Sequence, residues 1–375
     1  MEVEQVSNLE NKPFILGMDV SFMDEIEQHG GSYSDTDGKE QDLLSILKLN
    51  GANAIRLRIW NDPVGGFCNL ERTVTIAKRI KEQGLQFLLD FHYSDRWADP
   101  ANQWKPKAWE NLSYEELQRA VCTYTADVLH TLKEHDALPD MVQVGNEITP
   151  GMLWDEGRVS GEEHDTDEQW ERFAGLVKYG IAAVKSVDSN INIMIHIDRG
   201  GDNVESRKFY DRFEALGVEF DTIGLSYYPW WHGTLDALRD NLHDLAARYG
   251  KPINVVETAY PWTLEQPEDH EWILNQEDLL LPGYPASVEG QARYLQDLLQ
   301  IIREVPGGLG QGFYYWEPAW IPSKPEWSVG HPNNWGNLTM FDFKGRKLES
   351  FTALKADAIS EESKTDTPKG SALIR

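Results

Sequence analysis

The strongest constraint on the fold of this 375-residue chain is an eightfold alternation of short apolar segments with longer amphipathic ones. Runs rich in β-branched and aromatic residues predict strands at 14–22, 54–60, 86–92, 141–147, 192–198, 222–228, 253–259 and 312–318. Helical patterns follow them near 40–50, 70–83, 113–135, 167–187, 204–216, 234–249, 288–304 and 348–358. Eight such repeats predict an α/β fold, a single (β/α)8 TIM barrel with long βα loops.

The signals at the helix ends indicate which connections between strands and helices are short. Ser113, followed by Glu116 three residues later, predicts a capping box before the apolar stripe of helix 113–135. Gly84, Gly217 and Gly250 stand where helices should end before the next strand. The αβ connections are then short and the βα connections long, so we expect the site on the C-terminal face of the barrel.

The domain organisation is simple. We expect an N-terminal extension over residues 1–13, one barrel domain over 14–358, and a disordered polar tail over 359–375. The first 13 residues have neither a basic start nor an apolar stretch of the secretory type. As written, the sequence predicts a cytoplasmic protein, and an extracellular one if a signal had been removed.

The composition of the chain limits the classes of molecule that it is expected to bind. Lys and Arg total 35 against 62 Asp and Glu, which gives a formal net charge of −27. That charge repels nucleic acids and anionic membranes, so we expect neither as a partner, and a neutral substrate fits better. No nucleotide-binding glycine motif is present, so we expect no cofactor, and we expect a monomer. Cys68 and Cys122 do not form a disulfide framework.

Tryptophans collect after the predicted strands. Of 14 in the chain, Trp60 and Trp316 end strands and eleven lie in the loops that follow strands, among them Trp97 and Trp231. Indole stacks on the apolar face of a sugar ring, so this set predicts a carbohydrate site. The alternative interpretation is that tryptophans anchor the small cores of long loops.

Two glutamates end apolar strands at the predicted mouth of the barrel. They are Glu147, which follows Asn146 in MVQVGNE, and Glu257 in INVVETA. Hydrolysis of a glycosidic bond needs one protonated carboxyl and one carboxylate, and this pair supplies both. Arg58 could keep the nucleophile ionised by charge pairing. The alternative is that each glutamate forms a structural ion pair.

Longer motifs carry a family resemblance. FILGMDVSF, NAIRLRIWNDP, LLDFHYSDRWADP, QVGNEITPGMLW, IHIDRGGDN, LSYYPWWHGTL, VVETAYPW and FYYWEPAWIP resemble glycoside hydrolase family 53, the arabinogalactan endo-β-1,4-galactanases of clan A. The resemblance runs from about Phe14 to Leu354. It implies a retaining enzyme that cuts internal β-1,4 bonds of galactan, with Glu147 as acid/base and Glu257 as nucleophile.

The resemblance also implies which residues bind the substrate. With the strand-end and tryptophan arguments, the set of substrate-binding residues is Asp19, Arg58, Trp60, His92, Trp97, Asn146, Asp198, Tyr228, Trp231 and Trp316. Tyr228 is preferred over Tyr227 because strand alternation places Tyr228 on the same side as Ser226.

Three alternatives stay open on the sequence alone. The chain could be a sugar-binding barrel without catalysis, although both carboxylates are present. It could be a clan A hydrolase of another neutral β-linked polysaccharide, because galactose and glucose differ at C4 by the orientation of one hydroxyl. It could also be a metal-dependent hydrolase that uses His92, Asp95, His196 and Asp198, although ligand pairs such as His-x-His are absent.

A structural calcium ion is the remaining question. Some family members hold calcium after strand 7, where this chain has a long loop containing Asp269, His270 and Asp278. These three residues are weak candidates, because Ca²⁺ takes six to eight oxygen ligands. We therefore expect a solvated loop, and we expect EDTA to leave the melting temperature unchanged. A melting temperature that falls with EDTA and recovers with added Ca²⁺ would contradict this expectation.

Overall fold

The computed structural model describes residues 13–267, 270–322 and 333–355 and shows a closed barrel of eight parallel strands. The strands follow one another around the barrel in chain order, and the last pairs with the first. They are β1 (Ile15–Asp19), β4 (Ala54–Ile59), β5 (Gln86–Phe91), β6 (Met141–Val144), β9 (Asn192–Ile197), β10 (Thr222–Ser226), β11 (Ile253–Thr258) and β12 (Gly310–Trp316). The predicted TIM barrel is confirmed.

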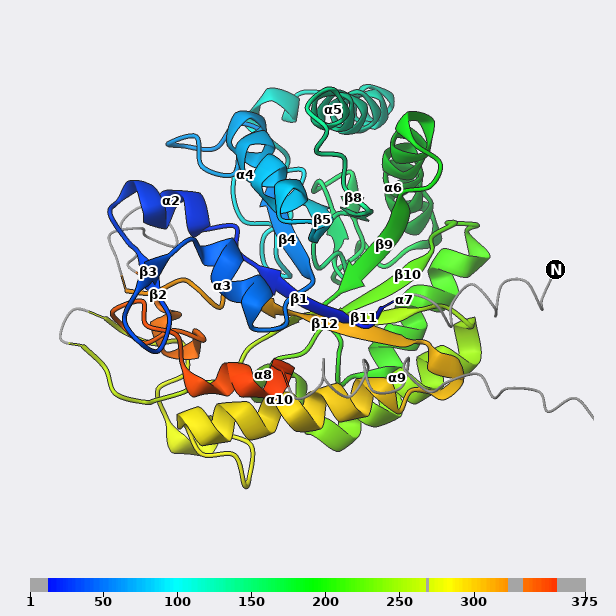
Figure 1. Ribbon diagram of the computed structural model, residues 1–375. Helices are drawn as coiled ribbons and strands as arrows, with labels where there is room; N and C mark the ends of the chain where they lie inside the picture. Colours follow the sequence, from blue (N-terminus) through cyan, green and yellow to red (C-terminus); the bar gives the residue numbers. More distant parts are fainter. Residues whose placement is uncertain (1–12, 268–269, 323–332, 356–375) are drawn as a thin grey trace, which may run out of the picture.

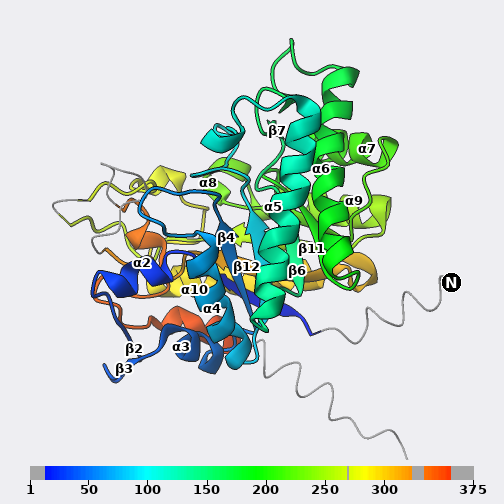
Figure 2. The same ribbon diagram turned by 90° about the horizontal axis from the view of Figure 1, so that it is seen from above.

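Helices surround the strands (Figures 1 and 2), and α5 and α6 pack side by side. The main helices are α3 (Leu43–Leu49), α4 (Leu70–Glu82), α5 (Tyr114–Glu134), α6 (Asp167–Val187), α7 (Asn203–Ala215), α9 (Leu235–Tyr249) and α10 (Val288–Arg303). The predicted last helix is seen as a 3₁₀ turn (η5, Glu349–Phe351) that continues as helix to residue 355, where the described part ends. No described helix is both long and apolar enough to cross a bilayer.

The predicted helix signals are confirmed. Ser113 and Glu116 form the capping box at the start of α5. Gly84, Gly217 and Gly250 have φ of 69°, 64° and 61°, the left-handed conformation that ends a helix. The αβ connections are therefore tight, and the long βα loops gather at the C-terminal end of the barrel.

One glycine allows the first and last strands of the barrel to pair closely. Gly312 on β12 pairs opposite Ile15 on β1 and has φ of 142°. A Cβ at this position would collide with the carbonyl oxygen of Ile15. A side chain there would therefore force apart the two strands that complete the ring.

Several short elements lie in the loops between strands and helices and have no predicted counterpart. They are α2 (Met23–Gln28), β2 (Tyr33–Ser34), β3 (Glu40–Gln41), β7 (Gly151–Met152), β8 (Gly157–Arg158), α8 (Pro229–His232), η1 (Lys107–Trp109), η2 (Glu277–Leu279), η3 (Pro306–Gly308) and η4 (Gly336–Leu338). All but η3 shape the end of the barrel that carries the site. The predicted extension 1–13 and tail 359–375 lie almost wholly outside the described residues.

Candidate active site

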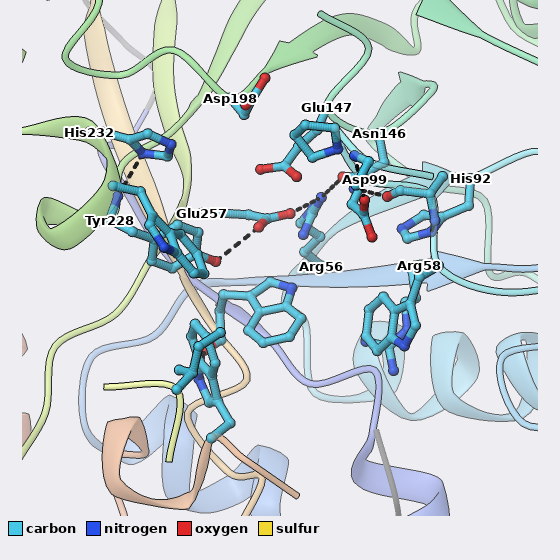
Figure 3. Close-up of a pocket in the computed structure, with 18 of the residues that line it drawn as sticks. Arg56, Arg58, His92, Asp99, Asn146, Glu147, Asp198, Tyr228, His232 and Glu257 are labelled. Atoms are coloured by element: carbon cyan, nitrogen blue, oxygen red, sulfur yellow. Dashed lines mark hydrogen bonds and ion pairs between the residues drawn. The ribbon is translucent and has the colours of Figure 1, made fainter. Parts of the chain in front are cut away.

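A cavity of about 520 Å³ opens at the C-terminal end of the barrel (Figure 3). Most of the predicted site residues line it: Arg58, His92, Trp97, Asn146, Glu147, Asp198, Tyr228, Trp231, Glu257 and Trp316. They come from strands and loops all around the barrel, and the fold brings them together on the face where the long loops meet. Two predicted binding residues, Asp19 and Trp60, are not among the lining residues.

Alternation along the strands explains how these residues reach the cavity. Ala54, Leu88, Met194 and Tyr314 belong to a small apolar cluster inside the barrel. Residues four positions further along the same strands, such as Arg58, His92 and Asp198, line the cavity. Between these two levels lies a layer of buried polar side chains that face the barrel interior: Asp19, Arg56, Asp90, Gln143, His196 and Ser226.

Glu147 and Glu257 face each other across the cavity. A carboxylate oxygen of Glu147 lies within 4.8 Å of one of Glu257, and both side chains are buried. β6 ends at Val144, earlier than predicted, because Gly145 has φ of 90° and Glu147 has φ of 47°. This left-handed turn presents the Glu147 carboxyl to the cavity, where it accepts a 2.6 Å hydrogen bond from Ser226 Oγ.

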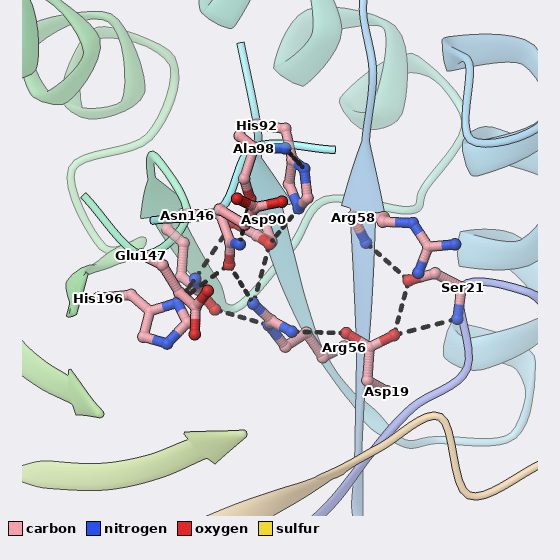
Figure 4. A network of polar contacts seen from close by, with 12 residues as sticks. Asp19, Ser21, Arg56, Arg58, Asp90, His92, Ala98, Asn146, Glu147 and His196 are labelled. Atoms are coloured by element: carbon pink, nitrogen blue, oxygen red, sulfur yellow. Dashed lines mark hydrogen bonds and ion pairs between the residues drawn. The ribbon is translucent and has the colours of Figure 1, made fainter. Parts of the chain in front are cut away.

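Arg56 is the centre of the buried polar layer (Figure 4). Its Nη2 lies 2.9 Å from Glu257 Oε1 and 2.9 Å from Asp90 Oδ2, and its Nη1 lies 2.7 Å from Asp19 Oδ2. Nε donates to Gln143 Oε1 at 2.7 Å. The guanidinium therefore joins the nucleophile candidate to residues of three other strands.

Asn146 belongs to the same network. Its Oδ1 accepts a 2.9 Å hydrogen bond from Arg56 Nη2, and its Nδ2 donates to the carbonyl oxygen of Ala98 at 2.8 Å. The side chain beside Glu147 is thus held in one orientation.

The prediction that Arg58 pairs with the nucleophile is wrong. Arg58 lines the cavity, but its Nη1 binds Glu317 Oε1 at 2.6 Å, and its guanidinium lies 4.3 Å from the ring centroids of Phe22 and Trp97. Arg56, two residues earlier on the same face of β4, takes the predicted role. The sequence places both arginines on one face but does not give their depth in the barrel.

Asp19 and Trp60 lie behind the lining residues rather than in the cavity wall. Asp19 is fully buried beside Arg56 and also accepts from Ser21 Oγ at 2.7 Å. Trp60 Nε1 donates to His92 Nδ1 at 3.1 Å, and its ring packs edge-on against Trp97 at 5.2 Å. Both residues support side chains that face the cavity.

Tyr228 touches the nucleophile candidate directly. Its hydroxyl donates to Glu257 Oε2 at 2.9 Å, whereas the Tyr227 hydroxyl donates to the carbonyl oxygen of Gly233. Strand alternation therefore selects the tyrosine that faces the cavity. Arg56 and Tyr228 hold one Glu257 oxygen each.

Burial and neighbouring charges set the protonation of the two carboxyls. Burial, followed by the nearby Glu257 charge, raises the pKa of Glu147 well above its ordinary value. Burial also raises the pKa of Glu257, to about 7, and the positive charge of Arg56 offsets part of that rise. A pair that shares one proton therefore keeps it on Glu147 and leaves Glu257 ionised.

The geometry does not favour the metal-dependent alternative. In the described ranges, the group of His, Cys, Asp and Glu side chains close enough to share an ion is Glu147, His196 and Glu257, without His92, Asp95 or Asp198. Both ring nitrogens of His196 already have protein partners, Ser226 Oγ at 2.8 Å and Gln143 Nε2 at 3.0 Å. His196 thus orients the serine that binds Glu147.

Two of the three calcium candidates lie in the part of the loop that the structure describes. Asp278 belongs to η2, and His270 packs against Trp272 with 5.2 Å between ring centroids. Asp269 lies outside the described residues. The expectation for calcium therefore stays a prediction.

The tryptophans fall into two groups, one that lines the cavity and one that is buried in the loops. Trp97, Trp231, Trp316, Trp320 and Trp335 line the cavity, and Trp231 is 55% exposed. The rings of Trp109, Trp154 and Trp272 are buried in the loops, where they act as anchors. Trp327 lies outside the described residues.

Sequence reasoning missed five polar residues at the base of the cavity, of which Arg56 also lines it: Arg56, Asp90, Gln143, His196 as a partner of Ser226, and Ser226 itself. One signal could have found them. Each is a polar residue at an inward-facing position of an otherwise apolar strand, two or three positions before a predicted site residue.

Comparison with known proteins agrees with this site. The model of glycosyl hydrolase family 53 matches residues 15–354. This chain belongs to glycosyl hydrolase family 53. It is therefore a glycoside hydrolase, and the sequence resemblance is confirmed.

Individual relatives cover most of the chain. An uncharacterized protein in the bgaB 5′ region of Niallia circulans is 86% identical over 98% of this chain and all of its own length. The endo-β-1,4-galactanase of Bacillus subtilis is 39% identical over 85% of this chain and 73% of its own. The solved family 53 catalytic domain of Ignisphaera aggregans has a TM-score of 0.87 and 44% identity, covering 92% of this chain and 97% of that domain.

Trp231 is expected to stack on a sugar, so Trp231→Ala should lower polysaccharide turnover about tenfold or more while the melting temperature changes little. Trp104→Ala is the matched control, because Trp104 is 43% exposed but does not line the cavity. Reducing-end assays and thermal unfolding of both variants check this. Equal losses of turnover in the two variants would contradict the stacking role.

Removing the Arg56 charge should raise the pKa of Glu257, because a nearby cation favours the ionised form. In Arg56→Met we therefore expect the acidic limb of the kcat/KM–pH profile to move to higher pH, with a loss of stability of about 3–5 kcal/mol. Arg58→Met is the control, since Arg58 is equally buried but pairs with Glu317. An acidic limb that moves in the Arg58 variant and not in the Arg56 variant would contradict the assignment.

Proposed function

We propose that this protein is an endo-β-1,4-galactanase that cuts internal β-1,4-galactosidic bonds of type I arabinogalactan, the pectic galactan, with net retention. The observation that carries the proposal is the separation of the two carboxyls, with oxygens of Glu147 and Glu257 within 4.8 Å. Retaining glycosidases hold their carboxyl groups about 5–5.5 Å apart, and inverting ones leave room for water at about 6.5–9.5 Å.

In the first step, ionised Glu257 attacks the anomeric carbon of the sugar that is cleaved. The bond from this carbon to the glycosidic oxygen breaks, and Glu147 gives its proton to that oxygen as the leaving chain departs. A covalent glycosyl-enzyme on Glu257 results. Arg56 and Tyr228 hold the two oxygens of Glu257 and so aim the carboxylate.

In the second step, Glu147 acts as the base. It takes a proton from a water molecule, which attacks the anomeric carbon and breaks the bond to Glu257. The inversions of the two steps cancel, so the configuration of the sugar is retained. The hydroxyl of Ser226 stabilises Glu147 while it is ionised between the steps.

The substrate class rests on two further observations. The net charge of −27 suits a neutral polymer, and the relative from Bacillus subtilis is named endo-β-1,4-galactanase. Cavity residues lie on both sides of the carboxylate pair, with Arg58 and His92 on one side and Asp198 and His232 on the other (Figure 3). A polymer can therefore pass across the pair, as an endo-acting enzyme requires.

The test compares linear β-1,4-galactan with carboxymethylcellulose, following reducing ends for the wild type, Glu147→Gln and Glu257→Gln. We expect galacto-oligosaccharides from galactan and no action on the cellulose derivative. Each variant should lose about 10³-fold or more in kcat, because each lacks one of the two carboxyls.

An unaltered far-UV spectrum and melting temperature serve as the folding control for both variants. Activity on another β-linked polysaccharide but not on galactan would contradict the proposed substrate. Activity that survives Glu257→Gln would contradict the assignment of Glu257 as the nucleophile.

A further inference from the structure

The surroundings of the two carboxyls indicate which side of the cavity receives the leaving sugar. The charges that act on Glu257 include Arg56, Asp19 and Asp90, which lie below it and toward β1 and β5. After Glu257, the charge with the largest effect on Glu147 is that of Asp198, which follows β9 and lines the same cavity (Figure 3). Since the proton donor must face the leaving oxygen, the leaving sugar belongs on the Asp198 side.

His232 lies on that side of the cavity. It is the last residue of the short helix α8, and its ring points toward the cavity (Figure 3). The backbone N–H of Tyr228 donates to His232 Nδ1 at 3.0 Å. A backbone amide can only donate, so Nδ1 is unprotonated and a neutral ring carries its hydrogen on Nε2.

The ring is neutral under ordinary conditions. Burial lowers the pKa of His232 to about 4, although the Asp198 charge acts against this shift. The charged groups around it are Asp198, Arg199 and Asp202 of the loop that packs on α8. His232 therefore presents a single N–H donor, fixed in place, at neutral pH.

A glycine holds this loop against α8. A Cβ at Gly201 would collide with the carbonyl oxygen of His232, so only glycine allows the contact. The preceding Asp198 accepts a 2.5 Å hydrogen bond from Thr149 Oγ1 and is paired with Arg199. The result is a fixed acceptor, Asp198, close to a fixed donor, His232.

We propose that His232 binds the leaving-group sugar by donating its Nε2–H to a hydroxyl of that sugar, with Asp198 as the opposing acceptor and Trp231 as the apolar platform. Alternating donors and acceptors beside an exposed indole suit a neutral sugar ring. This proposal rests on the proposed function and names the residues that hold the departing part of the chain.

The cavity continues in the same direction. A second hollow of about 440 Å³ shares Pro100 and Arg199 with the first and extends over Thr149 and Ser160. The polymer beyond the leaving sugar thus has a path along the surface rather than a closed wall.

The test uses two substrates of the same enzyme. In β-1,4-galactotetraose the leaving group is a sugar, whereas in 4-nitrophenyl β-1,4-galactobioside it has no sugar hydroxyls. His232→Asn keeps an acceptor for the Tyr228 N–H but lacks the distal donor. We expect its kcat/KM to fall about fivefold to tenfold on the tetraose and less than about twofold on the nitrophenyl substrate.

His232→Gln is the matched control, because its amide N–H can reach the position of Nε2. The ratio of its kcat/KM values on the two substrates should stay within about twofold of the wild-type ratio, because the distal donor is kept. Equal losses on the two substrates would show that His232 only supports α8 and would overturn the proposal. No loss in His232→Asn would overturn it as well.

Failure of the proposed function gives a different result. A wild type that does not cleave galactotetraose refutes the galactanase proposal. The same pair of variants can then be compared on an oligosaccharide and a nitrophenyl glycoside of whichever β-linked sugar the enzyme accepts, which still tests His232.

Discussion

The site depends on one buried cation. Arg56 is 1% exposed and lies inside the barrel, where an unpaired charge would cost several kcal/mol. It is stable there because Asp19, Asp90 and Glu257 surround it at 2.7–2.9 Å and Gln143 accepts from Nε. The same contacts tie β1, β4, β5, β6 and β11 together below the cavity. The position of Glu257, the proposed nucleophile, is therefore coupled to the stability of the barrel.

This network also gives the two glutamates different roles. Glu257 lies beside the guanidinium, which favours its ionised form, while Glu147 lies above an uncharged chain of Gln143, His196 and Ser226. Burial lowers the pKa of His196 well below its usual range, so this ring is neutral. One proton shared by the pair is thus held on Glu147, the proposed acid.

The sequence predicts the barrel because each strand and helix is long enough to show its own periodicity, and the C-terminal position of Glu147 and Glu257 follows from the barrel. It does not predict α8 or the two small hairpins, whose two to four residues are too short for any periodicity. Nor does the sequence show which of Arg56 and Arg58 pairs with Glu257. They share one face of β4, and which of them meets Glu257 depends on the stagger of β4 against β11 across the barrel, which alternation alone does not reveal.

The central claim is that Glu257, held by Arg56, attacks the sugar and forms a covalent intermediate. The most direct measurement is to incubate the enzyme with a 2-deoxy-2-fluoro β-galactobioside that carries a good leaving group, and to locate the added mass by peptide mapping. The account predicts one fluorinated disaccharide per chain, on Glu257. Label on another carboxylate, or β-to-α inversion of the product without a trapped intermediate, would contradict it.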